Sequence, residues 1–191
     1  IEEVRAAVDL EDFYNEIQKG YEGAGYRLLA FADQGFRVMT TNKRIEALVD
    51  FSGQKIRTME NPNHISFWRS LGAKPTPMSF SEVYIGLQQN TIDAQENPYE
   101  VIVSSRLYDQ QKYVIKTNHL PHLISLITNN DFYQGLSEEQ RAIIDSAALV
   151  AREYAREQAD LRVQDRISTM VDSGVEIIEL SEETHEAIKK K

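Results

Sequence analysis

The sequence contains no cysteine among its 191 residues. This absence excludes disulfides, thiolate zinc sites and cysteine nucleophiles, but it leaves the redox compartment open. No apolar run approaches the roughly 18–20 residues that a membrane-spanning helix needs. Basic residues are also scarce, with 21 Lys and Arg against 30 Asp and Glu, for a formal net charge of −9. That balance argues against a nucleic-acid partner, because proteins that bind phosphate backbones concentrate Lys and Arg.

Several motifs of enzymes and cofactor-binding proteins are missing as well. Neither GxGxxG nor GxxxxGK[ST] occurs, and there is no GxSxG, so no phosphate-cradling loop or nucleophile elbow is expected. The four histidines offer two close pairings, Glu60 with His64 and His119 with His122. Metal sites usually need three or four ligands at compatible spacing, so we expect no metal and no cofactor. An enzyme that uses Glu60 or His64 as a base stays open as an alternative, although no nucleophile or orienting group accompanies them.

The start of the chain also lacks what a complete precursor would have. Ile1 is followed by Glu2 and Glu3, with no initiator Met, basic segment or apolar segment. We therefore expect a processed chain or an internal fragment from which the signal peptide is absent. Hydrophobic residues make up 41% and charged residues 27%, which is typical of a folded protein with one large or two small domains.

Hydrophobic periodicity and cap signals predict strands that alternate with helices. This alternation is typical of an α/β architecture with a largely parallel sheet. The pattern at residues 137–172 exceeds the usual helix length, so that helix is expected to be kinked or shared between two lobes. We expect strands at 26–31, 35–41, 55–59, 92–95, 112–117, 122–128 and 175–180, and helices at 2–21, 62–72 with Asn61 as N-cap, 80–90, from 98, 137–172 and from 182.

Two arginines lie where a charge is costly. Arg37 and Arg57 sit within or at the end of short apolar strand patterns, where a charge needs a partner. In α/β proteins the carboxyl ends of the strands open into the ligand crevice. A guanidinium there offers a rigid fork of donors that matches a carboxylate. An internal salt bridge, or an exposed position at the sheet edge, remains the alternative for each arginine.

The segment from residue 55 to residue 98 is the most distinctive part of the chain. Together with flanking segments, in order and with matching spacing, it strongly resembles the DctP-type substrate-binding subunits of tripartite ATP-independent periplasmic (TRAP) transporters. The similarity runs from about residue 20 to the end. It is carried by Gly35-Phe36-Arg37, Lys55-Ile56-Arg57, Leu71-Gly72-Ala73, Pro75-Thr76-Pro77-Met78, Phe80-Ser81-Glu82-Val83-Tyr84, Asp93-Ala94-Gln95-Glu96-Asn97-Pro98 and Lys116-Thr117-Asn118-His119.

The resemblance implies a periplasmic-binding-protein-like fold. In such a fold two α/β lobes have central sheets flanked by helices, and a long helix braces both lobes. Residues 1–34 and 123–162 would form an incomplete lobe one. Residues 35–122 and 163–191 would form lobe two, with most of the ligand-contacting residues. The implied function is to capture a small organic acid in the bacterial periplasm and deliver it to TRAP membrane subunits through hinge closure. No chemistry on the ligand is implied, so the chain is not expected to be an enzyme.

The resemblance also implies roles for single residues. Arg57 matches the arginine that grips the ligand carboxylate, and Arg37 matches a second basic residue of the cleft. Asn97 matches a cleft amide, with an N-cap for the next helix as its alternative role. Phe80 matches an aromatic wall, with core packing as the alternative. Trp68 is either a ligand-stacking residue or, by its helical spacing with other apolar side chains, part of the core.

One departure from the family bears on the ligand. In the sialic-acid-binding branch an Asn lies three residues after the carboxylate arginine, whereas here that position is Glu60, with Asn61 beside it. A carboxylate there repels a second acidic group unless it accepts hydrogen bonds from sugar hydroxyls. We therefore expect a sugar acid or another hydroxy or keto acid, and a C4-dicarboxylate remains open.

Two further alternatives concern the whole chain. A ligand-sensing module of a receptor would use the same fold, and a fused signalling domain would distinguish it. Because lobe one would lack part of its sheet, an unmated edge or exposed apolar face also favours a homodimer of the fragment.

Overall fold

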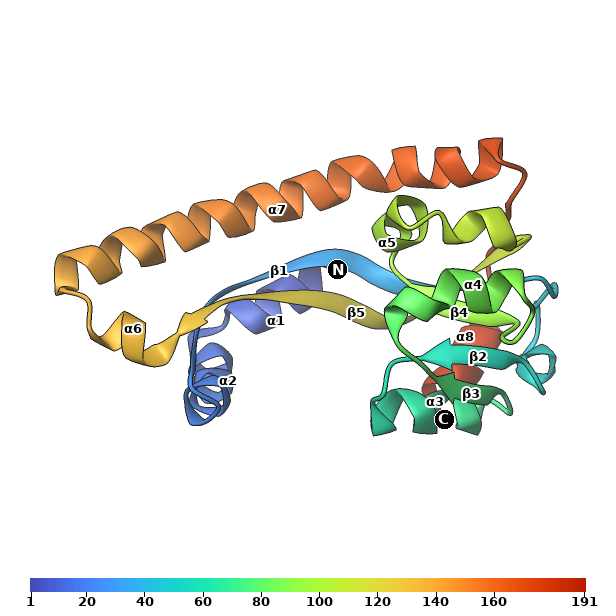
Figure 1. Ribbon diagram of the computed structural model, residues 1–191, viewed down its shortest axis with the longest axis horizontal. Coiled ribbons are helices and arrows are strands. Elements are labelled where there is room, and N and C mark those ends of the chain that lie inside the picture. Colours follow the sequence, from blue (N-terminus) through green and yellow to red (C-terminus); the bar gives the residue numbers. More distant parts are fainter. The chain divides into compact units, whose positions relative to one another are not determined.

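The computed structural model describes residues 1–191 and divides them into two compact units. Unit 1 comprises Ile1–Gly35 and Pro121–Leu161, and unit 2 comprises Phe36–Leu120 and Arg162–Lys191. These bounds lie within two residues of those expected for the lobes, and the assignment to lobes one and two stays a prediction. Three elements contribute residues to both units, namely β1 (Tyr26–Thr41), β5 (Tyr113–Asn129) and α7 (Glu138–Asp172) (Figure 1).

A mixed sheet of six strands organises unit 2. Its order is β3-β2-β4-β1-β5-β6, with β2 running parallel to both β3 and β4, and β5 parallel to β6. β1 runs antiparallel to β4 and places Val38 opposite Asn97. The expectation of a largely parallel sheet is therefore confirmed except at β1. The remaining strands are β2 (Lys55–Thr58), β3 (Lys74–Pro77), β4 (Ala94–Asn97) and β6 (Glu176–Ile178).

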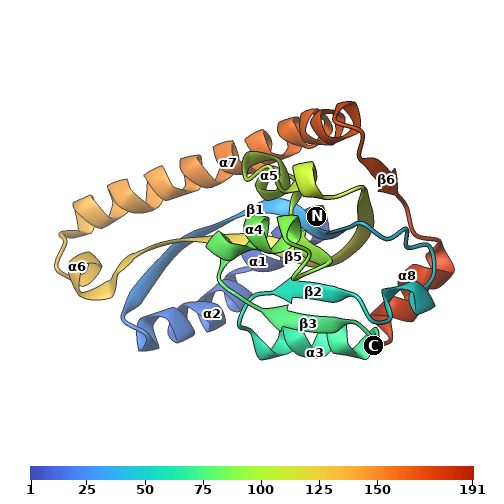
Figure 2. The same ribbon diagram turned by 45° about the vertical axis from the view of Figure 1, so that its right-hand side comes forward.

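Helices cover both faces of this sheet, which gives unit 2 two apolar layers (Figure 2). One layer joins Ile56 of β2 to Trp68 of α3 and Ile188 of α8. The other joins Val38 of β1 to helices on the opposite face and to Met170 near the end of α7. The helices are α3 (Pro62–Ser70), α4 (Val83–Gln88), α5 (Tyr99–Ser104) and α8 (Glu182–Lys189), with short 3-10 helices at Leu48–Phe51, Phe80–Glu82 and Leu107–Gln110. Successive residues of a strand point to opposite faces of the sheet. Ile56 therefore packs in the first layer, and the side chain of Arg57 lies on the opposite face of the sheet.

Several local signals act as the sequence predicts. The Asn61 side chain accepts hydrogen bonds from the amides of Asn63 and His64, and Pro62 occupies the first turn of α3. Ser181 caps α8 by accepting from the amide of Thr184. The expected helix at 80–90 begins with a 3-10 turn and continues as α4. These starts depend on local hydrogen bonds, which is why a short stretch of sequence predicts them.

Other boundaries differ from expectation. The strands expected at 26–31 and 35–41 form the single strand β1, and those at 112–117 and 122–128 form β5. The two strands are neighbours in the sheet. Each therefore supplies hydrogen-bond partners for the backbone of the other, and these keep both strands continuous where their sequences are polar. The helix expected at 2–21 is divided at Leu10, whose backbone is extended.

Unit 1 has a small core and an ion network. Its helices are α1 (Glu2–Asp9), α2 (Glu11–Gly23), α6 (Asn130–Gln134) and the amino-terminal part of α7. Val8, Leu28 and Phe31 form the fully buried part of the core. No helix in the structure combines the length and the apolar character that crossing a membrane requires.

Candidate functional site

Arg57 occupies the carboxyl-terminal half of β2 and is only 4% exposed. Its Nε and Nη2 atoms donate to the carbonyl oxygen of Met78 at 3.1 and 2.9 Å. No carboxylate forms an ion pair with it, and burial lowers the pKa of its guanidinium. A buried charge without a counter-ion is unfavourable by several kcal/mol in proteins. Arg57 is thus held by a backbone carbonyl in a position that favours an incoming anion.

Phe80 forms a wall beside this arginine. The Arg57 Cζ atom lies 5.7 Å from the centre of the Phe80 ring, within the range of a cation–π contact. Phe80 is 44% exposed, which speaks against the alternative that it belongs to the core. The carboxyl ends of β2 and β3 and the turn before α4 bring the two side chains together. The pair combines a donor for an anion with an apolar surface for the body of a ligand.

Arg37 has the opposite environment, because a carboxylate neutralises it. From β1 its Nε donates to Glu96 Oε2 at 2.5 Å and its Nη2 to Glu96 Oε1 at 2.9 Å. Both side chains are buried, with exposed fractions of 2% for Arg37 and 0% for Glu96. The internal salt bridge, left open for both arginines, is therefore what the structure shows for Arg37. The expected role as a second direct contact for the ligand carboxylate is not supported by this pairing.

Two histidines complete the surroundings of Glu96. His119 Nε2 lies 3.1 Å from Glu96 Oε2, and His64 Nδ1 lies 3.7 Å from Oε1. Burial alone would raise the pKa of Glu96, but His119, His64 and Arg37 outweigh it and hold that pKa well below its usual range. Burial lowers the pKa of His119, against the pull of Glu96. A neutral His119 can donate from Nε2 to Glu96 while Nδ1 accepts from the Thr117 hydroxyl at 2.8 Å.

Asn97 supports this network. Its Oδ1 accepts from Arg37 Nη2 at 2.9 Å, and its Nδ2 donates to Gln95 Oε1 at 2.7 Å. α5 has no side-chain cap, so the alternative N-cap role of Asn97 is wrong. Both ends of the amide have partners within the protein, and the residue is buried. Asn97 therefore positions Arg37 and Glu96 at the end of β4.

A cavity of about 280 Å³ opens beside the two histidines. Polar groups from the start of α3 meet an aromatic pair there, since the Phe67 and His119 rings stack at 5.3 Å. No group of three or more potential metal ligands gathers anywhere in the chain. The cavity is lined by Asn61, Asn63, His64, Phe67, His119 and Leu120.

Three other predicted site residues, Trp68, Glu60 and Asn61, have environments unlike those of Arg57 and Phe80. Trp68 has no exposed surface and packs against Phe51 and Phe67, so its expected contact with a ligand is corrected to core packing. Glu60 is exposed and forms no ion pair, not even with His64. Asn61 lines the cavity while its Oδ1 is used by the α3 cap.

Sequence reasoning gave no role to Glu96 or His119, although both lie in segments that carry the family resemblance. The strand expected from sequence ended at Gln95 and left Glu96 outside it, whereas the structure places Glu96 in a four-residue strand whose members are all buried. An acid in such a strand needs cationic or donor partners. The long-range partner itself, Arg37, could not be read from the local sequence.

Comparison with known proteins identifies a family. The family model described as bacterial extracellular solute-binding protein, family 7 (DctP) matches residues 1–191. The 2,3-diketo-L-gulonate-binding periplasmic protein YiaO of Escherichia coli is 34% identical over 165 residues, which are 86% of this chain and 50% of that protein. The ectoine-binding periplasmic protein TeaA of Halomonas elongata is 39% identical over 139 residues, or 73% of this chain and 41% of that protein.

A solved structure agrees with this assignment. A TRAP periplasmic solute-binding protein of Haemophilus influenzae with bound L-gulonate superposes with a TM-score of 0.93 at 31% identity, and the match covers 99% of this chain and 62% of that one. The expected fold class is confirmed by this match. The chain spans about half the length of the relatives that it matches in sequence.

Proposed function

Since the chain belongs to family 7 of the bacterial extracellular solute-binding proteins, we propose that it binds a small organic acid whose carboxylate pairs with Arg57. In this role it captures the acid in the periplasm and delivers it to the membrane subunits of a TRAP transporter. The ligand leaves chemically unchanged, because only recognition is required of the site. The observation that carries the proposal is the buried guanidinium of Arg57, which has a carbonyl partner but no carboxylate.

The physical basis is a difference between two states of the site. Without a ligand, the buried Arg57 guanidinium has the carbonyl oxygen of Met78 and the ring of Phe80 as neighbours but forms no ion pair with a carboxylate. A carboxylate that reaches Nη1 and Nη2 forms a charge-assisted, bidentate pair in a partly desolvated place, where such pairs are strong. Any closed conformation in which this pair forms is stabilised by the ligand. The membrane subunits then recognise that closed conformation.

Sugar acids are the ligand class that we favour. One matched protein is named for binding 2,3-diketo-L-gulonate, and the matched solved structure is described with bound L-gulonate. Both compounds combine a carboxylate with several polar oxygens. Beside Arg57 the chain offers Phe80 as an apolar wall, and three positions further along the sequence it offers Glu60 as an exposed acceptor for hydroxyls. A hydroxy or keto acid uses the same groups, whereas a second carboxylate would meet Glu60.

The proposal is tested by calorimetric titration of the full chain with L-gulonate and with the corresponding uncharged polyol. Arg57→Ala should weaken gulonate binding about 100-fold, since losing a partly buried charge pair costs about 2–5 kcal/mol. Arg57→Lys should recover part of the affinity, because the charge is kept and the bidentate fork is lost. The uncharged polyol should bind weakly to all variants.

Arg69→Ala is the matched control, because Arg69 is an exposed arginine on α3 of the same unit. It should leave gulonate binding unchanged. Wild-type affinity in Arg57→Ala would overturn the proposal. Mass spectrometry of the recovered ligand separates the alternatives, since an altered acid indicates an enzyme and an unaltered acid indicates a carrier or a sensing module.

A further inference from the structure

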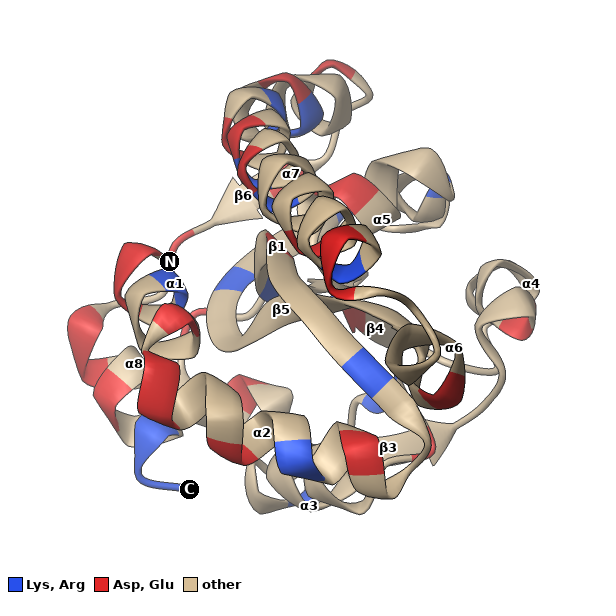
Figure 3. Cartoon of the chain, turned by 90° about the vertical axis from the view of Figure 1, so that its left-hand side faces the viewer, with Lys and Arg blue, Asp and Glu red and all other residues tan.

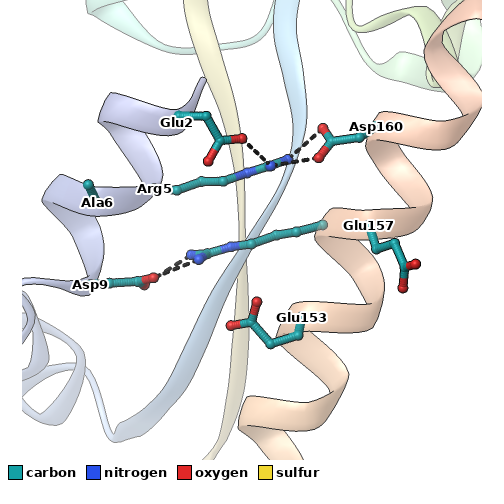
Figure 4. Close-up of a pocket in the computed structure, with 8 residues that line it drawn as sticks. Glu2, Arg5, Ala6, Asp9, Glu153, Glu157 and Asp160 are labelled. Carbon is teal, nitrogen blue, oxygen red and sulfur yellow. Dashed lines mark hydrogen bonds and ion pairs between the residues drawn. The ribbon is translucent and has the colours of Figure 1, made fainter.

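Arg57 differs from the other buried arginines of the chain in what holds it. Three of the four buried arginines pair with a carboxylate. In a charged pocket of unit 1, for example, Arg5 donates to Asp160, and Figure 4 shows the two side chains meeting there. Arg57 instead contacts the carbonyl oxygen of Met78 and the ring of Phe80. Whatever fixes these two neutral groups therefore fixes the guanidinium.

Both neutral groups belong to one short segment, residues 78–82, which joins β3 to α4. We call this segment the β3–α4 turn. β3 lies at the edge of the sheet, and its two prolines have no amide hydrogen to donate. At the start of the turn the amide of Met78 donates to the carbonyl of Thr58 at 3.3 Å. The sheet thus anchors the turn at its first residue, and Phe80 depends on bonds within the turn.

Glu82 closes the turn from its other end. Its Oε2 atom accepts from the amide of Ser79 at 3.2 Å, and its own amide donates to the carbonyl of Ser79 at 3.1 Å. A glutamate that reaches back in this way is typical of a helix start. Glu82 is the only charged residue between Lys74 and Asp93, and Figure 3 shows an acidic position, in red, where the chain enters α4. The two bonds to Ser79 enclose Phe80.

The turn also decides which edge of the Arg57 guanidinium a ligand can meet. Nε and Nη2 both donate to the Met78 carbonyl, which occupies the edge that these two nitrogens share. The edge formed by Nη1 and Nη2 is left for a carboxylate, which binds most strongly through two parallel hydrogen bonds. The Phe80 ring, centred 5.7 Å from Cζ, lies beside the guanidinium. A displaced turn would release the occupied edge and remove the ring.

We propose that Glu82 is a positioning residue for the Arg57 site and that it acts through the β3–α4 turn. With the turn in place, Met78 and Phe80 leave one edge of the guanidinium and one apolar face for the ligand. The ligand class that fits is an acid with a planar carboxylate and a carbon-bound face beside it. The ligand class rests on the proposed function, whereas the effect of Glu82 on Arg57 can be measured without a ligand.

The test is NMR spectroscopy of the ¹⁵N-labelled full chain, which measures how fast the Arg57 Nε hydrogen exchanges with water. Its signal is identified by its loss in Arg57→Lys. The Nε hydrogen of Arg37 is the internal reference, because it is bonded to Glu96 and not to the turn. Glu82→Ala should raise the Arg57 exchange rate about fivefold, the factor that corresponds to one lost capping bond. The Arg37 rate should not change.

Two matched variants separate the hydrogen bond from the charge. Glu82→Gln should restore the wild-type Arg57 rate, because the amide oxygen also accepts from Ser79. Glu183→Ala removes the same charge from the first turn of α8, at an exposed position of the same unit. It should leave the Arg57 rate unchanged, since Glu183 lies outside the β3–α4 turn.

Three results would overturn the inference: an unchanged Arg57 rate in Glu82→Ala, an equal rise at Arg37, or an equal rise in Glu82→Gln. A calorimetric titration with L-gulonate tests the proposed function separately. The Kd of Glu82→Ala should exceed that of the wild type by no more than the same factor of about five, because only the population with the turn in place binds. Wild-type protein that does not bind gulonate would count against the proposed ligand and leave the exchange result standing.

Discussion

Arg37 and Arg57 show that neighbouring groups give two buried side chains of the same type different roles. Both are buried in unit 2, yet Arg37 meets the carboxylate of Glu96 and Arg57 meets only the carbonyl of Met78. The first pair is neutral and needs no further partner, which makes it a support for the site. The second retains a charge that an anion can neutralise.

The Glu96 network predicts a stability that declines in acid. The folded pKa of His119 is lowered from 6.5, so its contribution is complete above that pH and decreases as the pH falls below it. The folded pKa of Glu96 is lowered from 4.5, so its contribution is complete above pH 4.5 and decreases below it. Urea titrations should therefore give a constant free energy of unfolding above about pH 7, a decline towards pH 5 and a steeper one below pH 4.5.

A His119→Gln variant separates the two groups, because an amide can donate to Glu96 but does not titrate. It should flatten the decline between pH 7 and pH 5 and leave the decline below pH 4.5. His185→Gln on α8 should retain the wild-type profile. A wild-type free energy that does not change between pH 7 and pH 5 would contradict a neutral His119 in the folded protein.

At the scale of elements, the strands β1 and β5 were the least predictable from sequence. Each was expected as two strands, because polar and small residues interrupt the apolar pattern near Gly35 and near Pro121. Gly35 has a φ of +73°, a conformation that glycine adopts without strain, and its amide donates to Asp33. Pairing between β1 and β5 keeps both strands continuous at these positions. The local sequence pattern alone does not predict that pairing.

At the start of α3, the capping of the helix can be separated from the lining of the cavity. Asn61 caps the helix and lines the cavity, whereas Asn63 lines the same cavity without capping. Asn61→Ala should lower the free energy of unfolding by about 1 kcal/mol, the usual effect of losing an N-cap. Asn61→Asp should retain most of it, since a carboxylate accepts the same bonds and suits a helix start.

The measurement is urea unfolding of the three variants Asn61→Ala, Asn61→Asp and Asn63→Ala. Asn63→Ala should change stability little, because its side chain accepts none of the α3 amides. Equal losses in Asn61→Ala and Asn63→Ala would mean that the cavity lining, and not the cap, determines stability here.

For the molecule as a whole, the two units depend on different interactions. Unit 2 has apolar layers on both faces of its sheet, whereas the buried core cluster of unit 1 comprises only Val8, Leu28 and Phe31. In unit 1 the buried Arg5 ties α1 to Asp33 of β1 and to Asp160 of α7. A network of this kind is sensitive to the loss of one partner, because the remaining charge stays buried.

Arg5→Met should therefore destabilise the protein by about 3 kcal/mol or more, since Asp33 would keep a buried charge with its main partner removed. Hydrogen exchange should rise in residues 1–35 and 121–161 and change little elsewhere. Adding Asp33→Leu to Arg5→Met should restore part of the stability. Arg44→Met, at an exposed arginine of unit 2, serves as the control, and a loss spread evenly over both units would contradict a local role for Arg5.

By itself the sequence determined the family, the α/β class, the long helix α7 and the caps of α3 and α8, and it predicted Arg57 as a ligand-binding residue. These depend on short-range patterns and on motifs whose order is preserved along the chain. Only the tertiary structure decided that Arg37 is neutralised by Glu96 and that Trp68 is core. Those properties depend on which distant residues meet, as Arg37 meets Glu96 across 59 positions. Burial and ion pairing arise only at such contacts, so local sequence does not specify them.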